Sequence, residues 1–333
     1  MEIAVVILNW NGMLLLEKFL PSIVEYSTEA TVYVVDNAST DDSVSFLEVF
    51  YPSVKIIKND SNLGFASGYN ESLKYIKADI YALVNSDIEV TKNWLQPILS
   101  TFEKEPKTAI IQPKILDFKQ KQYFEYAGAA GGYIDQYGYP YCRGRIFETL
   151  EKDNGQYNDN CEIFWASGAC FFIRSQVYHD LNGFDGEFFA HQEEIDLCWR
   201  ARNKRFIIKY NSQSVVYHVG GATLQQGHPM KTFLNFRNSL LMLTKNLPKS
   251  KLYKILLVRM LLDGVAGIQF LVKGKPTHLW AILKAHWSFY GFFKVYYGKR
   301  TEFQQQQYYN VKSIVYSYYI RKVIVFNDLF RIK

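Results

Sequence analysis

Two apolar runs in the first ninety residues each end in an aspartate. The runs cover residues 32–36 and 80–87, so that Asp36 and Asp87 stand at their ends. In an open parallel sheet, ligands bind beyond the carboxyl ends of the strands, and we therefore expect both acids at one crevice. Such a pair suits a sugar nucleotide, because one acid can reach the base or ribose while the other holds a divalent cation against the diphosphate.

The segments around these acids extend the pattern, although each also has an ordinary structural explanation. Asp36 suits a hydrogen bond from a pyrimidine N–H or a ribose hydroxyl, and it equally suits a helix-capping turn. Residues 62–70 carry Gly64 ahead of a predicted helix, where free N–H groups attract anions, but they lack the spacing of a Walker loop or a dinucleotide fingerprint. Asp87 suits a Mg²⁺ ligand or a simple strand-end turn.

Glu193, Glu194 and Asp196 lie within four residues at the predicted start of a helix. Clustered carboxylates raise one another's pKa, which suits a general base working near neutral pH. The helix dipole alone also favours acids at this position. Further along, His218 ends another predicted strand, where an imidazole either binds a metal or a phosphate or is purely structural.

An alternation of strands and helices must position these residues. The apolar, β-branched run at 3–8 predicts a strand that is buried on both faces. We predict further strands over 31–36, 54–58 and 80–85, with helices over 14–25, 43–50 and 65–77 between them. This order predicts a parallel sheet with helices on both faces.

The second half of the chain is less regular. We predict a strand around residues 110–115, strands over 169–173, 205–210 and 214–218, a loop region over 128–160 and a helix over 193–203. Long apolar stretches at 233–247 and 252–272 are helical in texture. The second contains Lys254, Arg259 and Asp263, which favours an amphipathic helix at a membrane surface over a spanning one. A helix packed on the rest of the protein is the alternative.

Composition indicates a globular protein with an unevenly distributed charge. The 333 residues are 48% hydrophobic and 21% charged, and residues 230–333 hold 18 Lys and Arg against 3 Asp and Glu. This basic segment predicts an anionic partner, and without a nucleic-acid-binding motif we expect a membrane surface and no nucleic acid. The four cysteines have no zinc spacing and predict reduced thiols in a cytosolic setting, with no signal peptide before the first strand.

Taken together, the segments resemble the inverting GT-A glycosyltransferases of family 2, particularly bacterial rhamnosyltransferase-like members, over roughly residues 2–245. The combination is specific, although each mark alone is weak. The marks are Leu8-Asn9-Trp10-Asn11, Val34-Val35-Asp36-Asn37-Ala38-Ser39-Thr40-Asp41, Asn62-Leu63-Gly64-Phe65-Ala66, Asn70, Asn85-Ser86-Asp87, Gly183-Phe184-Asp185, the acidic helix start and His218.

The resemblance implies an α/β GT-A fold, Rossmann-like with a mixed, mostly parallel sheet, and a C-terminal helical, basic, aromatic-rich extension. Residues 1–229 would form the catalytic domain, with a nucleotide-sugar half at about 1–110 and an acceptor and catalytic half at about 111–229. Residues 230–333 would form a membrane-associating region.

The resemblance also implies roles for individual residues. The donor would be bound by Asn9, Asn11, Asp36, Asn62, Gly64, Asn85 and Asp87, the acceptor by Trp165, Ser167 and Gly168, and Mg²⁺ or Mn²⁺ by Asp87 and His218. Asn85 replaces the first acid of the family's DXD element, which leaves Asp87 as its only carboxylate. Glu194 stands where the family has a catalytic Asp. Because Glu reaches one methylene further, its partner Glu193 and Asp196 stay open as the base.

The implied activity is a single displacement with inversion, of hexosyltransferase type, similar in logic to inverting glycosidases. The expected donor is dTDP-rhamnose, with UDP- and GDP-sugars open, and the acceptor is a glycan or lipid-linked glycan in the synthesis of a cell-surface polysaccharide such as O-antigen. The expected location is cytoplasmic, peripheral on the inner face of the bacterial plasma membrane.

Two other functions are compatible with a similar sheet. A sugar-nucleotide nucleotidyltransferase would carry a glycine-rich, basic loop near the N-terminus, but residues 8–16 contain no basic residue. A non-catalytic sugar-nucleotide-binding module would not need Asp36, Asp87, Glu194 and His218 together.

Overall fold

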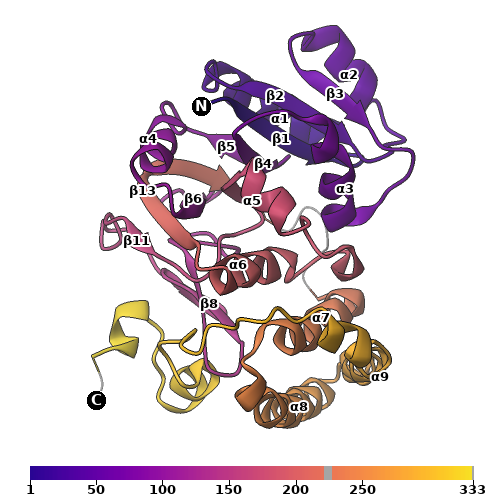
Figure 1. The fold of residues 1–333 in the computed structure, drawn as a ribbon, viewed down its shortest axis with the longest axis vertical. Helices are drawn as coiled ribbons and strands as arrows, with labels where there is room; N and C mark the ends of the chain where they lie inside the picture. The colour runs from indigo at the N-terminus through magenta and orange to yellow at the C-terminus, as the bar shows by residue number, and fades with distance from the viewer. Residues whose placement is uncertain (221–226, 332–333) are drawn as a thin grey trace.

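The computed structural model describes residues 1–220 and 227–331. This part of the chain is built around one large mixed sheet, with a smaller antiparallel sheet and a group of helices at the other end of the molecule (Figure 1). Residues 221–226, a segment that begins three residues after His218, lie outside the described residues.

The large sheet has the order β11-β13-β6-β12-β4-β1-β2-β3, and β5 pairs separately with β13. Strands β1 to β4 pair in parallel, as expected, whereas β12 runs antiparallel to both β4 and β6. The predicted α/β class with a mixed sheet is therefore confirmed. The strands are β1 (Ile3–Asn9), β2 (Thr31–Asp36), β3 (Lys55–Lys58), β4 (Ile80–Asn85), β5 (Ile88–Val90), β6 (Thr108–Asp117), β11 (Cys161–Glu162), β12 (Cys170–Arg174) and β13 (Ile207–His218).

Helices cover both faces of this sheet because successive side chains of a strand point to opposite sides. In β1, Val5 packs in a core cluster with α1, whereas the neighbouring Val6 packs in a second cluster with Tyr69 of α3. The helices around the sheet are α1 (Met13–Glu25), α2 (Ser43–Phe50), α3 (Gly64–Ser72), α4 (Gln96–Lys104), α5 (Ser175–Asp180) and α6 (Glu193–Asn203).

Two sequence predictions differ from the structure in the second half. The strands expected over 205–210 and 214–218 are one strand, β13, with an irregularity between Asn211 and Val215. The loop expected over 128–160 contains a four-stranded antiparallel sheet in the order β10-β9-β8-β7. Its strands are β7 (Gly132–Ile134), β8 (Pro140–Cys142), β9 (Arg145–Ile146) and β10 (Thr149–Leu150).

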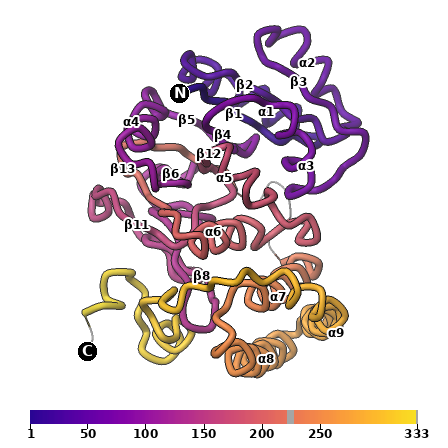
Figure 2. The backbone as a smooth tube through the Cα atoms, in the orientation of Figure 1, coloured from indigo at the N-terminus to yellow at the C-terminus, as the bar shows by residue number. Residues whose placement is uncertain are grey.

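The C-terminal segment packs against this small sheet. Figure 2 shows the chain leaving α9 and running back past β8 to the C-terminus. The Tyr308 hydroxyl donates a hydrogen bond to the Gln136 carbonyl at 2.7 Å, and the Phe326 ring lies 5.2 Å from the Tyr133 ring. Short helical turns occur at Leu73–Tyr75, Gly186–Phe188, Tyr316–Ile320 and Phe326–Leu329.

Three long helices, α7 (Pro229–Asn246), α8 (Lys249–Val272) and α9 (Pro276–Gly298), form the end of the molecule opposite the N-terminus. Among the described helices, α8 alone is long and apolar enough to cross a membrane by length and composition. Its Arg259 and Asp263 are buried and paired at 3.1 Å, and His286 of α9 lies 3.1 Å from Asp263. These charges of α8 therefore face protein rather than the surroundings.

Candidate active site

The parallel register brings the predicted nucleotide-binding residues to one edge of the sheet. Asn9 pairs with Asp36 across β1 and β2, and Asn85 lies opposite Leu8 across β4 and β1. Asn9 Nδ2 donates a hydrogen bond to Asp36 Oδ1 at 3.3 Å, and both side chains are buried. Asn11, in a left-handed conformation, accepts a 2.7 Å hydrogen bond from the N–H of Thr40. The strand ends thus hold Asn9, Asp36 and Asn85 together, with Asn11 in the turn that follows β1.

The loop that carries Asn62 and Gly64 closes onto the same edge. Asn62 Oδ1 accepts hydrogen bonds from Asn37 Nδ2 and from the N–H of Gly64, each at 2.9 Å. Gly64 has a φ of +74°, and a Cβ there would come 2.7 Å from the Phe189 ring. Only glycine fits this close approach, so the loop is fixed against the segment that precedes α6.

Asp87 and His218 meet because β5 pairs antiparallel with the end of β13. His218 Nε2 lies 3.1 Å from Asp87 Oδ1, and its Nδ1 lies 3.2 Å from Glu125 Oε1 without hydrogen-bond geometry. All three side chains are buried. Burial alone would lower the pKa of His218, but the charges and contacts of Glu125 and Asp87 raise it to about 10.

A divalent cation that displaced the proton from His218 Nε2 would find two donor atoms, from Asp87 and His218, and could also take phosphate oxygens. A carboxylate oxygen and an imidazole nitrogen are compatible with Mn²⁺, and a bound diphosphate supplies further oxygens. Within residues 1–220 and 227–331, no three His, Cys, Asp or Glu side chains converge to hold an ion by themselves. The protein could therefore supply only part of the coordination.

Glu194 lies close to the strand edge. A Cβ built on Gly168 would stand 3.8 Å from Glu194 Cδ, and the carbonyl of the next residue, Ala169, accepts a 2.9 Å hydrogen bond from the N–H of Asn85. Burial raises the pKa of Glu194 to about 7. Burial and the charge of Glu194 raise the pKa of Glu193 well above its ordinary value. Of the two carboxyl groups, Glu194 is therefore the one that ionises first as the pH rises.

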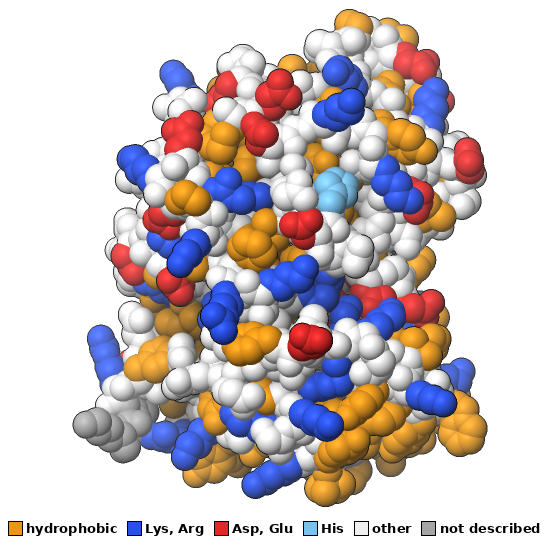
Figure 3. All heavy atoms as spheres, in the orientation of Figure 1, with side chains coloured by type: hydrophobic (Ala, Val, Ile, Leu, Met, Phe, Trp, Pro, Cys, Tyr) orange, Lys and Arg blue, Asp and Glu red, His pale blue; other side chains and the backbone are white. Residues whose placement is uncertain are grey.

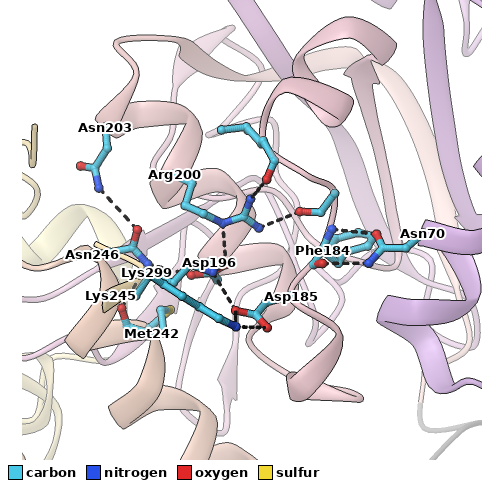
Figure 4. A network of polar contacts seen from close by, with 12 residues as sticks. Asn70, Phe184, Asp185, Asp196, Arg200, Asn203, Met242, Lys245, Asn246 and Lys299 are labelled. Atoms are coloured by element: carbon cyan, nitrogen blue, oxygen red, sulfur yellow. Dashed lines mark hydrogen bonds and ion pairs between the residues drawn. The ribbon is translucent and has the colours of Figure 1, made fainter. Parts of the chain in front are cut away.

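Asp196 has different surroundings, which Figure 4 shows. It is fully buried and accepts hydrogen bonds from Arg200 Nε at 2.7 Å, Lys245 Nζ at 2.9 Å and Asn246 Nδ2 at 2.8 Å. Burial alone would raise its pKa, but the charges of Lys245 and Arg200 lower it. Lys245 also pairs with Asp185 at 2.9 Å. These contacts tie α6 to α7.

The residues before α6 form a strained loop held by Asn238 of α7. Phe189, His191 and Gln192 have φ angles of 60°, 71° and 75°, a region that costs energy for non-glycine residues and is frequent at functional sites. The buried Asn238 Nδ2 donates to the carbonyls of Phe188, Ala190 and His191 at 2.9, 3.0 and 2.8 Å. Asn238 therefore fixes the approach to Glu193 and Glu194.

The three predicted acceptor residues are not equivalent. Trp165 and Ser167 are buried, and Trp165 Nε1 donates a 3.0 Å hydrogen bond to the Tyr133 carbonyl. Gly168 is partly exposed and lies beside Glu194. Of the three, only Gly168 is thus placed to contact a molecule that approaches Glu194.

Sequence reasoning did not single out Glu125 or Asn238. Glu125 stands alone in an irregular stretch, and nothing local distinguishes it from a surface acid. Asn238 gives a weak signal, since it is an amide in a mostly apolar stretch of helix, where a buried polar group needs partners.

Residues 4–181 match the sequence profile of glycosyl transferase family 2. The chain belongs to this family. A curated relative is the N-acetylglucosaminyl-diphospho-decaprenol L-rhamnosyltransferase of Mycobacterium tuberculosis, which is 22% identical over 219 residues, or 61% of this chain and 71% of the relative. The expected likeness to rhamnosyltransferase-like members is confirmed at the level of the family.

Solved structures support the GT-A fold. GalNAc-T7 with UDP, GalNAc and Mn²⁺ superposes with a TM-score of 0.60 at 14% identity over 75% of this chain, which spans about half (49%) of that chain. S. aureus TarS 1-349 in complex with UDP-GlcNAc gives 0.57 at 15% identity, over 90% of this chain and 91% of that one. As a family 2 member of this fold, the chain is a glycosyltransferase that uses a nucleotide-sugar donor.

Proposed function

We propose that this glycosyltransferase is metal-dependent and inverting, with Glu194 as its general base. The position of Glu194 carries the proposal. It lies beside Gly168, next to the strand edge that holds Asp36 and Asp87, and burial brings its pKa to about 7. A base with that pKa suits proton abstraction near neutral pH.

The reaction is one displacement. Glu194 takes the proton of an acceptor hydroxyl while the hydroxyl oxygen bonds to the anomeric carbon of the donor sugar. The bond from that carbon to the diphosphate oxygen breaks with its electrons, and a nucleoside diphosphate leaves. Because attack and departure occur on opposite faces, the product has inverted configuration.

Asp87 and His218 would hold Mn²⁺ or Mg²⁺ at this site, and the cation would supply positive charge to the leaving diphosphate. Glu125 Oε1 lies 3.2 Å from His218 Nδ1 on the side of the ring opposite Asp87, where its charge would favour the orientation in which Nε2 faces Asp87. The Mn²⁺ in the GalNAc-T7 structure supports a metal in this fold.

The first candidate for the donor is dTDP-rhamnose, and for the acceptor a lipid-linked glycan. The relative named as an L-rhamnosyltransferase of N-acetylglucosaminyl-diphospho-decaprenol supports the sugar and the acceptor, while the dTDP carrier is expected from the family resemblance alone. UDP-sugars stay open, since TarS was crystallised with UDP-GlcNAc, and so do GDP-sugars, which the sequence does not distinguish from them. A role in cell-surface polysaccharide synthesis follows from such an acceptor.

We also propose that the enzyme works on the inner face of the plasma membrane, and that α8 and α9 lie in the bilayer surface. Figure 3 shows hydrophobic side chains gathered at the lower right, over α8 and α9, with Lys and Arg beside them. Apolar side chains with basic neighbours bind anionic bilayers. The apolar face of α8 and α9 consists of Leu257, Leu261, Val265, Ile268, Trp280, Leu283 and Trp287, all more than half exposed.

A donor screen tests the catalytic proposal. The full chain is melted with dTDP-rhamnose, UDP-GlcNAc or GDP-mannose, each with and without Mn²⁺, since a ligand that binds only the folded state raises the melting temperature. We expect one donor to raise it, to do so more strongly with Mn²⁺, and to be hydrolysed slowly. In an Asp87→Ala variant, Mn²⁺ should no longer add to the rise in melting temperature that the donor causes. If no donor is hydrolysed, the chain is a binding module and the catalytic proposal is wrong.

Sedimentation with vesicles tests the membrane proposal. The chain should pellet with phosphatidylglycerol vesicles at low salt, and Trp287→Asp, on a side chain that is 82% exposed, should weaken this association. Equal recovery in the supernatant with and without vesicles would count against it.

A further inference from the structure

A mainly apolar groove of about 640 Å³ lies between the first turns of α7 and α9. Its volume falls within the range of about 300–1,000 Å³ that is typical of small-molecule sites. Met230 and Phe233 of α7 line one side, and Trp280 and Ala281 of α9 line the other. The polar members of the lining are His228, Thr277 and Lys284. A 2.8 Å contact between Thr232 Oγ1 and His278 Nδ1 ties the two helices together here.

The groove opens onto the apolar face of α8 and α9. Trp280 belongs to both, and Leu283 and Trp287 continue that face along the next two turns of α9. Ala281 is buried at the base of the groove, whereas Met230 and Trp280 are 51% and 58% exposed at its rim. A hydrocarbon chain that leaves a bilayer at this face meets a continuous apolar path into the groove.

The other end of the groove leads toward residues 188–192, the loop that precedes Glu193 and Glu194. Five residues beyond Met230, about 8 Å along α7, the side chain of Asn235 accepts a 3.4 Å hydrogen bond from Gln192 Nε2. Gln192 directly precedes Glu193. Lys231 directly follows Met230 in the first turn of α7. Burial, and after it the positive charge of Lys231, lower the pKa of His191 to about 4. The first two turns of α7 therefore link the groove to the loop before the proposed base.

Two positive charges lie along this path, and the charge of Glu148 acts on Lys231 only from beyond ion-pair distance. Among the described residues, no carboxylate lies within ion-pair distance of Lys231 or Lys284. Lys284 Nζ instead lies 5.6 Å from the centre of the Trp280 ring. Two free ammonium groups beside an apolar groove complement a molecule with a long hydrocarbon tail and an anionic phosphate head.

We propose that this groove binds the isoprenoid chain of a lipid-linked acceptor, and that Lys231 contacts the diphosphate that joins the lipid to the sugar. The chain enters from the bilayer beside Trp280 and runs between Met230 and Ala281. The diphosphate then lies at the first turn of α7, and the attached sugar is directed past Gln192 toward Glu194. This inference rests on the proposed function, because it assumes that the acceptor is membrane-bound.

Photo-crosslinking tests the groove without any variant. A farnesyl diphosphate carrying a benzophenone at its far end is irradiated with the full chain, and labelled peptides are mapped. We expect labels on residues 228–233 and 276–284, competed by unlabelled farnesyl diphosphate and much less by inorganic pyrophosphate. Labels confined to the outer face of α8, or an even spread over the surface, would overturn the proposal.

Two variants then distinguish binding of the hydrocarbon chain from binding of the diphosphate. Met230→Asp places a charge in the groove at a helix N-terminus that tolerates acids, and should weaken farnesyl diphosphate binding about tenfold or more. Lys231→Ala should weaken binding of farnesyl diphosphate but leave farnesol binding unchanged. The matched control is Val49→Asp on α2, where an apolar residue that is 69% exposed is replaced far from the groove. Equal affinities in Met230→Asp and Val49→Asp would refute the groove.

Donor hydrolysis by the unaltered chain is measured in the same preparation. Hydrolysis of a nucleotide sugar without farnesyl diphosphate binding overturns the groove alone. Absence of hydrolysis with any donor overturns the proposed function instead. The two failures are therefore distinguishable.

Discussion

The pKa of Glu194 makes a quantitative prediction about the pH dependence of catalysis. A base must be ionised to accept a proton, so the rate falls as pH falls through the base's pKa. With a pKa of about 7, raised by burial from an ordinary value of 4.5, about a tenth of Glu194 is ionised at pH 6 and about nine tenths at pH 8. We therefore expect kcat at saturating donor and Mn²⁺ to rise about tenfold across this interval, whereas an ordinary glutamate would give a flat profile.

Replacement of Glu194 shows whether this rise in kcat between pH 6 and pH 8 is due to the proposed base. Glu194→Gln keeps the shape of the side chain but cannot take a proton, and should lower kcat by about 10²–10⁴-fold. Its residual rate should not depend on pH between 6 and 8. Glu194→Asp restores the carboxylate about one methylene further back. It should recover part of the rate and also the rise in kcat with pH.

The assay is hydrolysis of the donor identified by thermal shift, in which water takes the place of the acceptor hydroxyl. Initial rates are taken at fixed, saturating Mn²⁺, because protons compete with the metal for His218. A flat wild-type profile would show that burial does not raise the pKa of the base. If kcat of Glu194→Gln still rose tenfold between pH 6 and pH 8, another residue would be the base, and Glu193 would be the first candidate.

Three further variants probe the residues around the base. Asp87→Ala should abolish transfer while the melting temperature stays near that of the wild type, and unchanged turnover would exclude Asp87 as a metal ligand. Glu125→Gln should weaken Mn²⁺ binding, measured by electron paramagnetic resonance, by about 10–100-fold because His218 loses its orienting carboxylate; equal affinity would make Glu125 purely structural. Asn238→Ala leaves three loop carbonyls without their donor, and should cost about 1–3 kcal/mol of stability in urea unfolding and lower kcat more than it raises the KM for the donor.

The N-terminal half could be predicted closely from the sequence. The predicted ranges 31–36, 43–50 and 80–85 coincide with β2, α2 and β4. Buried parallel strands are continuous apolar runs that end abruptly at polar residues, and these runs are short and well separated here. The carboxyl ends of parallel strands lie at one edge of the sheet, where ligands bind. The same pattern therefore also predicted that Asn9, Asp36 and Asn85 meet there.

The second half depends on pairings between residues distant in the sequence. The three-residue strand β5 is too short to recognise by periodicity, yet its pairing with β13 is what brings Asp87 to His218. Strand β12 enters antiparallel between β4 and β6, and no local signal gives its direction. Glu125 reaches His218 from a non-adjacent loop for the same reason.

The acidic cluster shows how far residue type can be separated from role. Glu193, Glu194 and Asp196 look equivalent in the sequence, and the choice between them could not be made there. In the fold, the 100° step between successive helical residues turns Asp196 toward α7, where Lys245 and Arg200 hold its charge, while Glu194 faces Gly168. Neighbours that are distant in the sequence therefore decide which carboxylate keeps a pKa suited to catalysis.

Helix α7 connects the site to the rest of the C-terminal region. Asn238 holds the carbonyls before the base, and Lys245 and Asn246 hold Asp196 on α6. All three lie beyond residue 229, the boundary expected from the sequence between a catalytic domain and a membrane-associating region. That boundary stays a prediction, but a chain ending there would leave Asp196 as a buried carboxylate with only Arg200 as its cation. The first turn of the same helix lines the groove, so one helix both holds the loop before the proposed base, through Asn238, and faces the proposed lipid at its N-terminal end.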